Sequence, residues 1–203
     1  MAVKLYRGDL PADFVAGPAI AIDTETLGLN PRRDRLCLVQ ISTGDGNAYL
    51  IQIDAKSPAA PRLKAVLEDP AVLKIFHFAR FDVAVLKHAL GANTAPLYCT
   101  KIASKIARTY TDRHGLKDLL RELLGIDANK QQQSSDWGAH VLTDAQKTYA
   151  AGDVIYLHEL KARLTQMLER EGRMVLAQAC FEFLPTRTAL DLGGWGEEDV
   201  FAH

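Results

Sequence analysis

The chain has 203 residues, of which 48% are hydrophobic and 24% are charged. This length suits one domain, and the composition excludes a disordered, fibrous or low-complexity protein. The 24 basic and 25 acidic residues give a net charge of −1. That balance argues against a protein that holds long nucleic acids by bulk charge, because such proteins are usually strongly basic. A small anionic ligand held locally is compatible with it.

The three cysteines, Cys37, Cys99 and Cys180, are an odd and widely spaced set without a CxxC pair. They indicate buried thiols in a reduced compartment rather than a zinc site or a disulfide framework. No apolar run approaches the ~20 residues of a membrane span. The first residues also lack the apolar core of a signal peptide. We therefore expect a cytoplasmic protein that does not bind a membrane.

The first half of the chain carries short apolar runs that are typical of strands. A turn-like segment, residues 43–47, separates the second run from the third and predicts a hairpin. A short helix is expected around Leu63–Leu67, ended near Pro70. The expected strands are Ala19–Asp23, Leu36–Ile41, Ala48–Ile53 and Val72–Phe76.

The second half is predicted to be helical, because apolar residues recur there at helical spacing. Thr143 and Gln146 form a capping box, and Pro185 is expected to end the last helix. Residues 129–137 are polar and irregular. Strands followed by helices predict an α/β or α+β fold with helices packed on a mixed sheet. The expected helices are Phe81–Leu90, Thr100–Ala107, Leu116–Leu124, Thr143–Leu168 and Arg170–Phe183.

Two acids, Asp23 and Glu25, close the most apolar of the expected strands. Residues at i and i+2 of a strand point to the same side, so both carboxylates face one place. Their repulsion falls when a divalent cation lies between them, and hard cations such as Mg²⁺ or Mn²⁺ prefer oxygen ligands. The pair alone is more typical of two solvated loop acids.

Two further motifs favour the metal site. Asp82 follows the segment His77–Phe81, at the carboxyl end of another expected strand. Tyr149 and Asp153 are four residues apart on one expected helix and share a face. The small residues between them allow another backbone or a ligand to approach.

These motifs resemble, in order, those of the DEDD superfamily of 3′→5′ exonucleases, in its tyrosine-bearing branch. The run from Ala19 to Leu160 is similar to ribonuclease D catalytic domains, through LVQI, HGLKDLL, SDW and YAAGDVIYL. Nearly the whole chain looks like the short, stand-alone nanoRNase C group of that branch. The resemblance implies a single exonuclease domain over residues 1–203, without the helical HRDC domains of ribonuclease D.

The resemblance also implies an α/β fold with a ribonuclease H-like mixed sheet flanked by helices. It implies two divalent cations, Mg²⁺ or Mn²⁺, as cofactors for phosphodiester hydrolysis. Asp23, Glu25 and Asp153 would hold the cation that activates water. Asp23 would bridge to a second cation, supported by Asp82. Tyr149 would orient the attacking water or accept its proton; because a phenol has a pKa of about 10, the second role needs help from metal charge.

A larger set of residues is predicted to bind substrate. By resemblance, His77 lies near the substrate sugar or phosphate, and Leu29 wedges between the terminal bases; each has a place in the core as its alternative. The stretches 108–114 and 130–135 would hold the other phosphate, or else be solvated surface. Trp137 would stack on a base or belong to the core. The candidates are Thr24, Leu29, His77, Phe81, Arg108, Tyr110, Arg113, His114, Gln133, Ser134 and Ser135.

The absence of an evident basic track favours a short substrate. The resemblance implies hydrolysis of RNA dinucleotides and other very short RNA to nucleoside monophosphates. It also implies a ring-shaped homo-octamer, with a tail at residues 184–203 packed on its own domain or on a neighbouring protomer. One alternative is a general ribonuclease D-like exonuclease on longer RNA or DNA 3′ ends. The other is a catalytically silent nucleic-acid-binding module, although all five catalytic positions are present.

Overall fold

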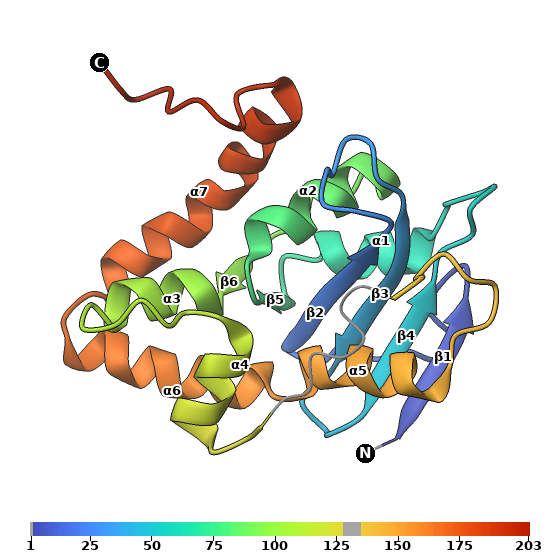
Figure 1. Ribbon diagram of the computed structural model, residues 1–203, viewed down its shortest axis with the longest axis horizontal. Coiled ribbons are helices and arrows are strands. Elements are labelled where there is room, and N and C mark those ends of the chain that lie inside the picture. The colour runs from blue at the N-terminus through green and yellow to red at the C-terminus, as the bar shows by residue number, and fades with distance from the viewer. Residues whose placement is uncertain (1, 128–134) are drawn as a thin grey trace.

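The computed structural model describes residues 2–127 and 135–203, in which six strands form one mixed sheet. The strands lie in the order β1-β4-β3-β2-β5-β6 (Figure 1). Strand β1, at the edge, carries charged residues among its apolar ones, and β6 has three residues; the apolar pattern predicted neither. The strands are β1 (Val3–Arg7), β2 (Ala19–Thr26), β3 (Leu36–Ser42), β4 (Ala48–Gln52), β5 (Leu73–Phe76) and β6 (Leu97–Cys99).

The centre of the sheet is antiparallel and its flanks are parallel. Strand β3 pairs antiparallel with both β2 and β4, which confirms the predicted hairpin. Strands β1 and β4, β2 and β5, and β5 and β6 pair in parallel. Every residue of β3 is buried, as expected for a central strand covered on both faces. The predicted mixed sheet flanked by helices is therefore confirmed.

The helices of the described residues follow the predicted order, with two changes. The segment predicted as one helix over 116–124 is a short α-helix followed by a π-helical turn. The segment predicted over 143–168 divides at Tyr156, a turn residue with φ of −98° and ψ of −6°. The helical segments are α1 (Pro61–Glu68), α2 (Ala79–Leu90), α3 (Thr100–Ala107), α4 (Leu116–Leu119), η1 (Leu120–Leu124), α5 (Asp144–Ile155), α6 (Leu157–Arg170) and α7 (Met174–Gly193).

The prediction that Pro185 ends the last helix is wrong. Helix α7 continues through this proline to Gly193, so residues 184–193 are helix rather than an irregular tail. Proline removes one backbone hydrogen bond but leaves the flanking turns free to pack. Here Leu184 and Thr188 are buried, and Asp191 accepts two hydrogen bonds of 2.7 Å from Arg80 of α2. These tertiary contacts hold the helix beyond the point at which local sequence favours a stop.

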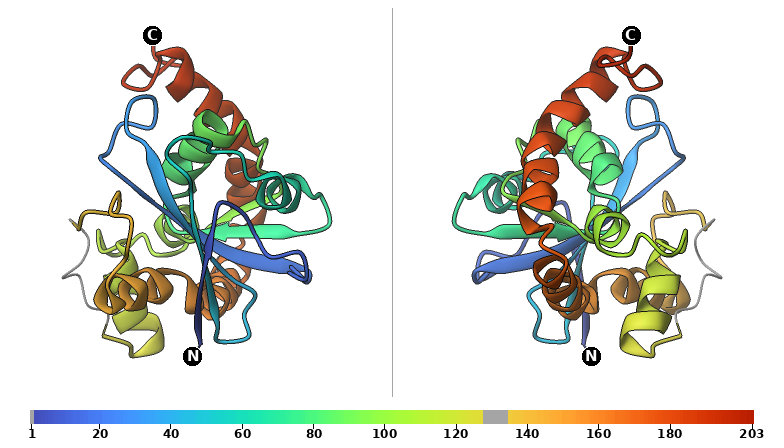
Figure 2. Two further views of the ribbon diagram at one scale, coloured as in Figure 1. Left: turned by 90° about the vertical axis from the view of Figure 1, so that its right-hand side faces the viewer. Right: turned by 90° about the vertical axis from the view of Figure 1, so that its left-hand side faces the viewer.

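The helices pack against the sheet and against one another (Figures 1 and 2). Helix α5, capped by the predicted Thr143–Gln146 box, packs on β2, β3 and β4. Helix α2 packs on β2, β3, β5 and β6, and α7 lies against α2 and β6. Helices α5 and α2 thus both contact strand β2, although they are far apart in the sequence. None of the helices that the structure describes has the length and apolar character needed to cross a membrane.

Lys74 on β5 is fully buried and holds two loops to the sheet. Its ammonium donates to the carbonyl oxygens of Asp69 at 2.6 Å and Val72 at 2.7 Å, and to that of Ala95. Burial lowers the pKa of Lys74 to about 8. The lysine therefore ties the segments that precede β5 and β6 to each other.

We expect Lys74→Met to lower the free energy of unfolding by about 2–4 kcal/mol, measured from the urea midpoint. Each carbonyl left without a partner costs about 1–3 kcal/mol, partly offset by removal of a buried charge. Lys56→Met, at an exposed position, is the control and should leave the midpoint unchanged. An unchanged midpoint in the Lys74 variant would contradict this account of the lysine.

Candidate active site

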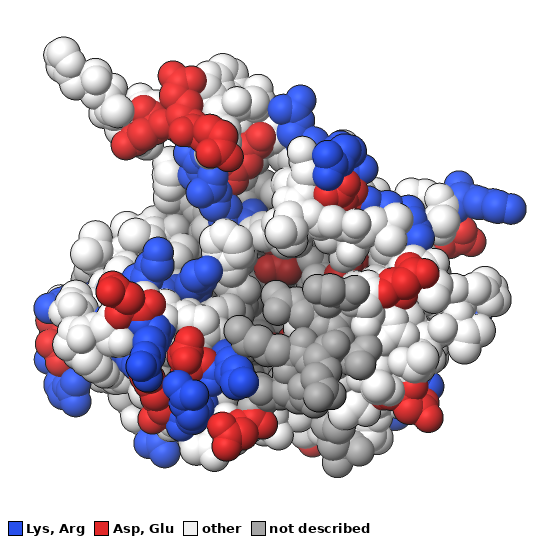
Figure 3. Space-filling view, viewed as in Figure 1, with Lys and Arg blue, Asp and Glu red and all other residues white. Residues whose placement is uncertain are grey.

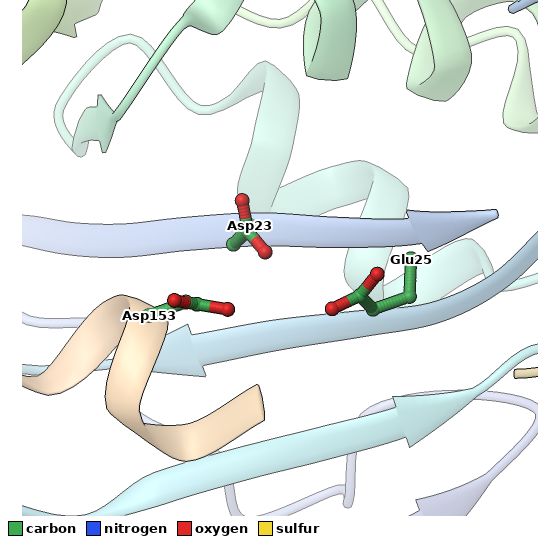
Figure 4. Close-up of side chains that lie close together, drawn as sticks. All are labelled: Asp23, Glu25 and Asp153. Atoms are coloured by element: carbon green, nitrogen blue, oxygen red, sulfur yellow. The ribbon is translucent and has the colours of Figure 1, made fainter. Parts of the chain in front are cut away.

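Three carboxylates converge at one end of strand β2. Asp23 and Glu25 project from the same face of β2, and Asp153 projects toward them from α5 (Figure 4). One oxygen of each carboxylate lies within 4.8 Å of the others. Among the described residues, these three form the cluster of possible metal ligands.

Asp82 stands beside this cluster rather than in it. It lies in the first turn of α2 and is buried, and its Oδ1 accepts a hydrogen bond of 2.7 Å from the hydroxyl of Thr24. Thr24 is the residue between Asp23 and Glu25 and points to the other face of the strand. The Thr24 hydroxyl donates to Asp82, so substrate binding by Thr24 stays a prediction that would have to use its other atoms.

All four acids have pKa values raised above those of free carboxyl groups. Burial first, and then repulsion from Asp153 and Asp82, raise the pKa of Glu25 to about 9. Burial is also the largest cause that raises the pKa of Asp82 to about 7 and that of Asp153 to about 7. The pKa of Asp23 is raised well above its usual range by burial and by the other three acids. Clustered carboxylate oxygens with this mutual repulsion fit a hard divalent cation.

Tyr149 completes the predicted motif on α5, one turn before Asp153. Its hydroxyl is hydrogen-bonded to the Asp153 carboxylate, and burial with the nearby acids raises its pKa far above the ordinary value. Its ring lies 6.0 Å from that of Trp137, centre to centre. Trp137 is buried, so its place is in the core rather than on a base. Without a cation at the acids, Tyr149 therefore stays protonated, which suits it to orienting a water.

His77 lies in the loop between β5 and α2, and its ring state follows from its partners. The Thr100 hydroxyl donates to the Phe76 carbonyl oxygen at 3.1 Å, so it accepts from His77 Nδ1 at 2.9 Å. Burial, and then the nearby Lys101 charge, lower the pKa of His77 to about 3. A neutral ring with a proton on Nδ1 leaves Nε2 as a hydrogen-bond acceptor. His77 is thus not a plain core histidine.

These residues line one open cavity of about 680 Å³. Figure 3 shows acidic side chains recessed in a hollow near the centre of the molecule, with lysines and arginines gathered over α3, α4 and α6. The cavity lining includes several of the predicted substrate-binding residues. It comprises Asp23, Thr24, Glu25, Thr26, Leu27, Gly28, Leu29, His77, Phe81, Gly115, Leu116, Lys117, Ser135, Trp137, Tyr149 and Asp153.

Leu29 stands at the cavity with 88% of its surface exposed, so the core alternative for it is excluded. The loop that presents it is shaped by Gly28. A Cβ atom at Gly28 would lie 2.3 Å from Oδ2 of Asp34, so a larger residue would force the Asp34 side chain to move. The close approach at Gly28 is therefore to Asp34, and it leaves Leu29 free to meet a ligand.

The basic stretch does not line the cavity as predicted. Arg108 is only 2% exposed, donates to the Glu122 carboxylate and to the Arg113 carbonyl oxygen, and so belongs to the interior. His114 Nδ1 is hydrogen-bonded to Ser104, and Tyr110 is exposed beside Arg108. The spacing of charged residues could not predict that Arg108 already has an acidic partner. Gln133 and Ser134 lie outside the described residues.

Two residues near the site were missed by the sequence analysis. Lys117 lines the cavity, and Gln40 of β3 donates from Nε2 to Oδ2 of Asp23 at 3.3 Å. The signal for Gln40 was present, because it is the long polar side chain in the otherwise apolar run Leu36–Ile41. The signal for Lys117 was a lone cation among leucines, which is common on any surface helix.

Comparison with known proteins places the chain in a protein family. Residues 9–169 match the 3′-5′ exonuclease family. A ribonuclease D from Gluconacetobacter diazotrophicus is 36% identical over 160 residues, which are 77% of this chain and 39% of that protein. The chain thus spans about two fifths of that relative's length.

Two solved structures match the chain over its whole length. Brucella melitensis NrnC with bound Mg²⁺ is 59% identical, with a TM-score of 0.96 and coverage of 100% of both chains. Brucella melitensis NrnC bound to pGG is 60% identical, with a TM-score of 0.96 and coverage of 100% of this chain and 99% of the other. The chain therefore belongs to the 3′-5′ exonuclease family, in the tyrosine-bearing branch that its motifs indicate and beside NrnC.

Proposed function

We propose that this chain is a metal-dependent 3′→5′ exoribonuclease that hydrolyses very short RNA, dinucleotides above all, to nucleoside monophosphates. The observation that carries the proposal is the convergence of Asp23, Glu25 and Asp153 within 4.8 Å at an open cavity. A volume of about 680 Å³ suits a small ligand. The pGG bound to the 60% identical NrnC supports a dinucleotide in particular.

The acids present fit two divalent cations, Mg²⁺ or Mn²⁺. Asp23, Glu25 and Asp153 would hold one, and Asp23 would also bind the second, which Asp82 would support through water. When bound, the two cations supply the positive charge that activates a water and stabilises the leaving 3′-oxygen. The Mg²⁺ in NrnC at 59% identity supports this assignment.

The neutral side chains of the cavity would orient the reactants. Tyr149, which stays protonated and is hydrogen-bonded to Asp153, can accept a hydrogen bond from the attacking water through its remaining lone pair. His77 Nε2 can accept from a hydroxyl of the terminal sugar. Leu29 and Phe81 supply apolar surface for the bases, and the Lys117 ammonium can meet a phosphate.

The test of this function is the dependence of turnover on substrate length. We expect the wild type to cleave a 5′-labelled RNA dinucleotide with a kcat/KM at least tenfold higher than that for a seven-residue RNA. A cavity of this size encloses a dinucleotide but leaves a longer strand largely outside. Equal cleavage of the seven-mer with accumulating dimers would instead support the general ribonuclease D-like alternative, and a DNA series run in parallel covers DNA 3′ ends.

Asp153→Asn is the matched control for this experiment, because it removes one charge and almost no volume. We expect it to lower turnover at least about a thousandfold while the variant stays folded. Activity retained in a clean preparation would place the reaction elsewhere in the molecule. A wild type without turnover on any RNA or DNA would support the silent binding module.

The carboxylates make the stability of the cation-free protein depend on pH. Glu25 has a pKa of about 9 in the folded protein and a usual value of 4.5. The folded state therefore holds protons that the unfolded chain has released, so stability falls as pH rises from about 4 to about 9. We expect the thermal midpoint in EDTA to fall by roughly 5 °C or more between pH 5 and pH 9.

Added Mg²⁺ should raise this midpoint more at high pH than at low pH, because the cation competes with those protons. Glu25→Gln should flatten the pH dependence in EDTA. A midpoint that does not change with pH in the wild type would contradict the raised pKa values.

We also propose that the single exonuclease domain, residues 1–203, assembles in the cytoplasm as a homo-oligomer, a ring-shaped octamer by resemblance. The three cysteines are free, as is usual in a reduced compartment. Val175 on α7 is 85% exposed and Phe201 in the tail is 78% exposed. The chain after α7 extends away from the body (Figure 1), where a neighbouring protomer could cover it. Exposed apolar side chains of this size favour burial at an interface.

Light scattering on the wild type should then give a particle of several chains, eight for the octamer. We expect Val175→Glu combined with Phe201→Glu to lower that mass, because each change places a charge on the exposed apolar surface. A wild type that scatters as one chain would contradict the assembly proposal.

A further inference from the structure

Gln40 is a long polar side chain in the most buried strand of the sheet. It is fully buried on β3 and lies directly opposite Asp23 in the β2–β3 register. Its Nε2 donates to Asp23 Oδ2 at 3.3 Å, while its Oε1 is buried without a hydrogen-bond partner among the described residues. The Gln40 amide therefore has a hydrogen-bond partner for its nitrogen but not for its oxygen.

Stability does not explain this residue. Its neighbours Leu38, Val39 and Ile41 are all fully buried and apolar. A buried polar atom left without a partner costs about 1–3 kcal/mol, which an apolar side chain at the same position would not incur. Gln40 differs from its neighbours in its hydrogen bond to Asp23. The function of Gln40 therefore concerns Asp23.

The hydrogen-bond donor to Asp23 is an uncharged amide. A lysine or arginine at this position would hold Asp23 more firmly, but its charge would replace that of a cation. The amide of Gln40 donates a proton while adding no charge. Thr24 does the same for Asp82 through its hydroxyl, at 2.7 Å. Within residues 2–127 and 135–203, no ion pair engages any of the four acids, so the negative charge of the cluster stays available.

We propose that Gln40 is a positioning residue for cation binding. It holds one oxygen of Asp23 by a neutral hydrogen bond, so that the other oxygen stays available to a divalent cation. Residues that orient metal ligands in this way typically contribute 10–100-fold to metal affinity. The inference rests on the proposed function, since it assigns Asp23 as a ligand.

The test compares Mn²⁺ binding by wild type and Gln40→Met, measured by calorimetry and by electron paramagnetic resonance. Methionine has nearly the same length and volume but cannot donate. We expect the dissociation constant for Mn²⁺ to rise about tenfold, while the thermal midpoint in EDTA stays equal or rises. Ser42→Ala, a fully buried position on the same face of β3, is the control and should bind Mn²⁺ as the wild type does.

Turnover of a dinucleotide gives a second readout. The Mn²⁺ concentration for half-maximal activity should rise by the same factor in Gln40→Met, with kcat at saturating Mn²⁺ within about threefold of the wild type. A residue that only packs the core would not shift the metal dependence. Gln40→Asn, whose amide is one methylene too short to reach Asp23, should behave like the methionine variant and serves if the latter does not fold.

The two proposals fail in different ways. If the wild type binds Mn²⁺ and cleaves the dinucleotide, but a folded Gln40 variant binds Mn²⁺ equally tightly, the inference about Gln40 is overturned and the function stands. If the wild type neither binds Mn²⁺ nor cleaves the dinucleotide, the proposed function fails instead.

Discussion

The repulsion among four partly or fully buried carboxylates is the constraint on which the rest of this structure depends. Burial is the first cause that raises the pKa of each acid, and charge repulsion from neighbouring acids raises those of Asp23, Glu25 and Asp82 further. A sequence selected for stability alone would not gather them. The fold must hold the backbones of the four acids close together although the ionised carboxylates repel one another. Each acid must therefore be attached to a rigid part of the structure.

The fold meets that requirement by taking the acids from the ends of regular elements. Strand β2, paired on both sides, carries two of them, and α2 and α5 each carry one close to a helix end or beside small residues. The neighbouring donors, Gln40, Thr24 and Tyr149, are all neutral. The scaffold thus fixes the geometry of the acids without cancelling their charge, which is what a cation site requires.

Much of this arrangement follows from local sequence. The apolar run that ends in Asp23 predicts β2, the i, i+2 spacing puts Asp23 and Glu25 on one face, and the i, i+4 spacing pairs Tyr149 with Asp153. That the two pairs meet was implied only by the resemblance to the exonuclease family. Elements that depend on distant partners were not predictable in this way. Pro185 does not end α7, because Arg80 and the buried face of α7 hold the next turns. Arg108 is buried because Glu122, fourteen residues away, accepts its hydrogen bond. Sequence alone predicts that a polar residue is exposed, because its partner in the fold is not known.

The net charge of −1 takes on a different meaning once the site is placed. Three of the 25 acids line one cavity and Asp82 is buried beside them, so the rest of the chain carries a slight excess of basic residues. An RNA 3′ end, itself negative, is repelled by the cavity as long as the carboxylates are ionised and without cations. Cation binding therefore already matters for substrate binding, before hydrolysis. It turns repulsion between the site and the RNA into attraction. A short RNA, with few phosphates to hold elsewhere, depends on that change more than a long one does.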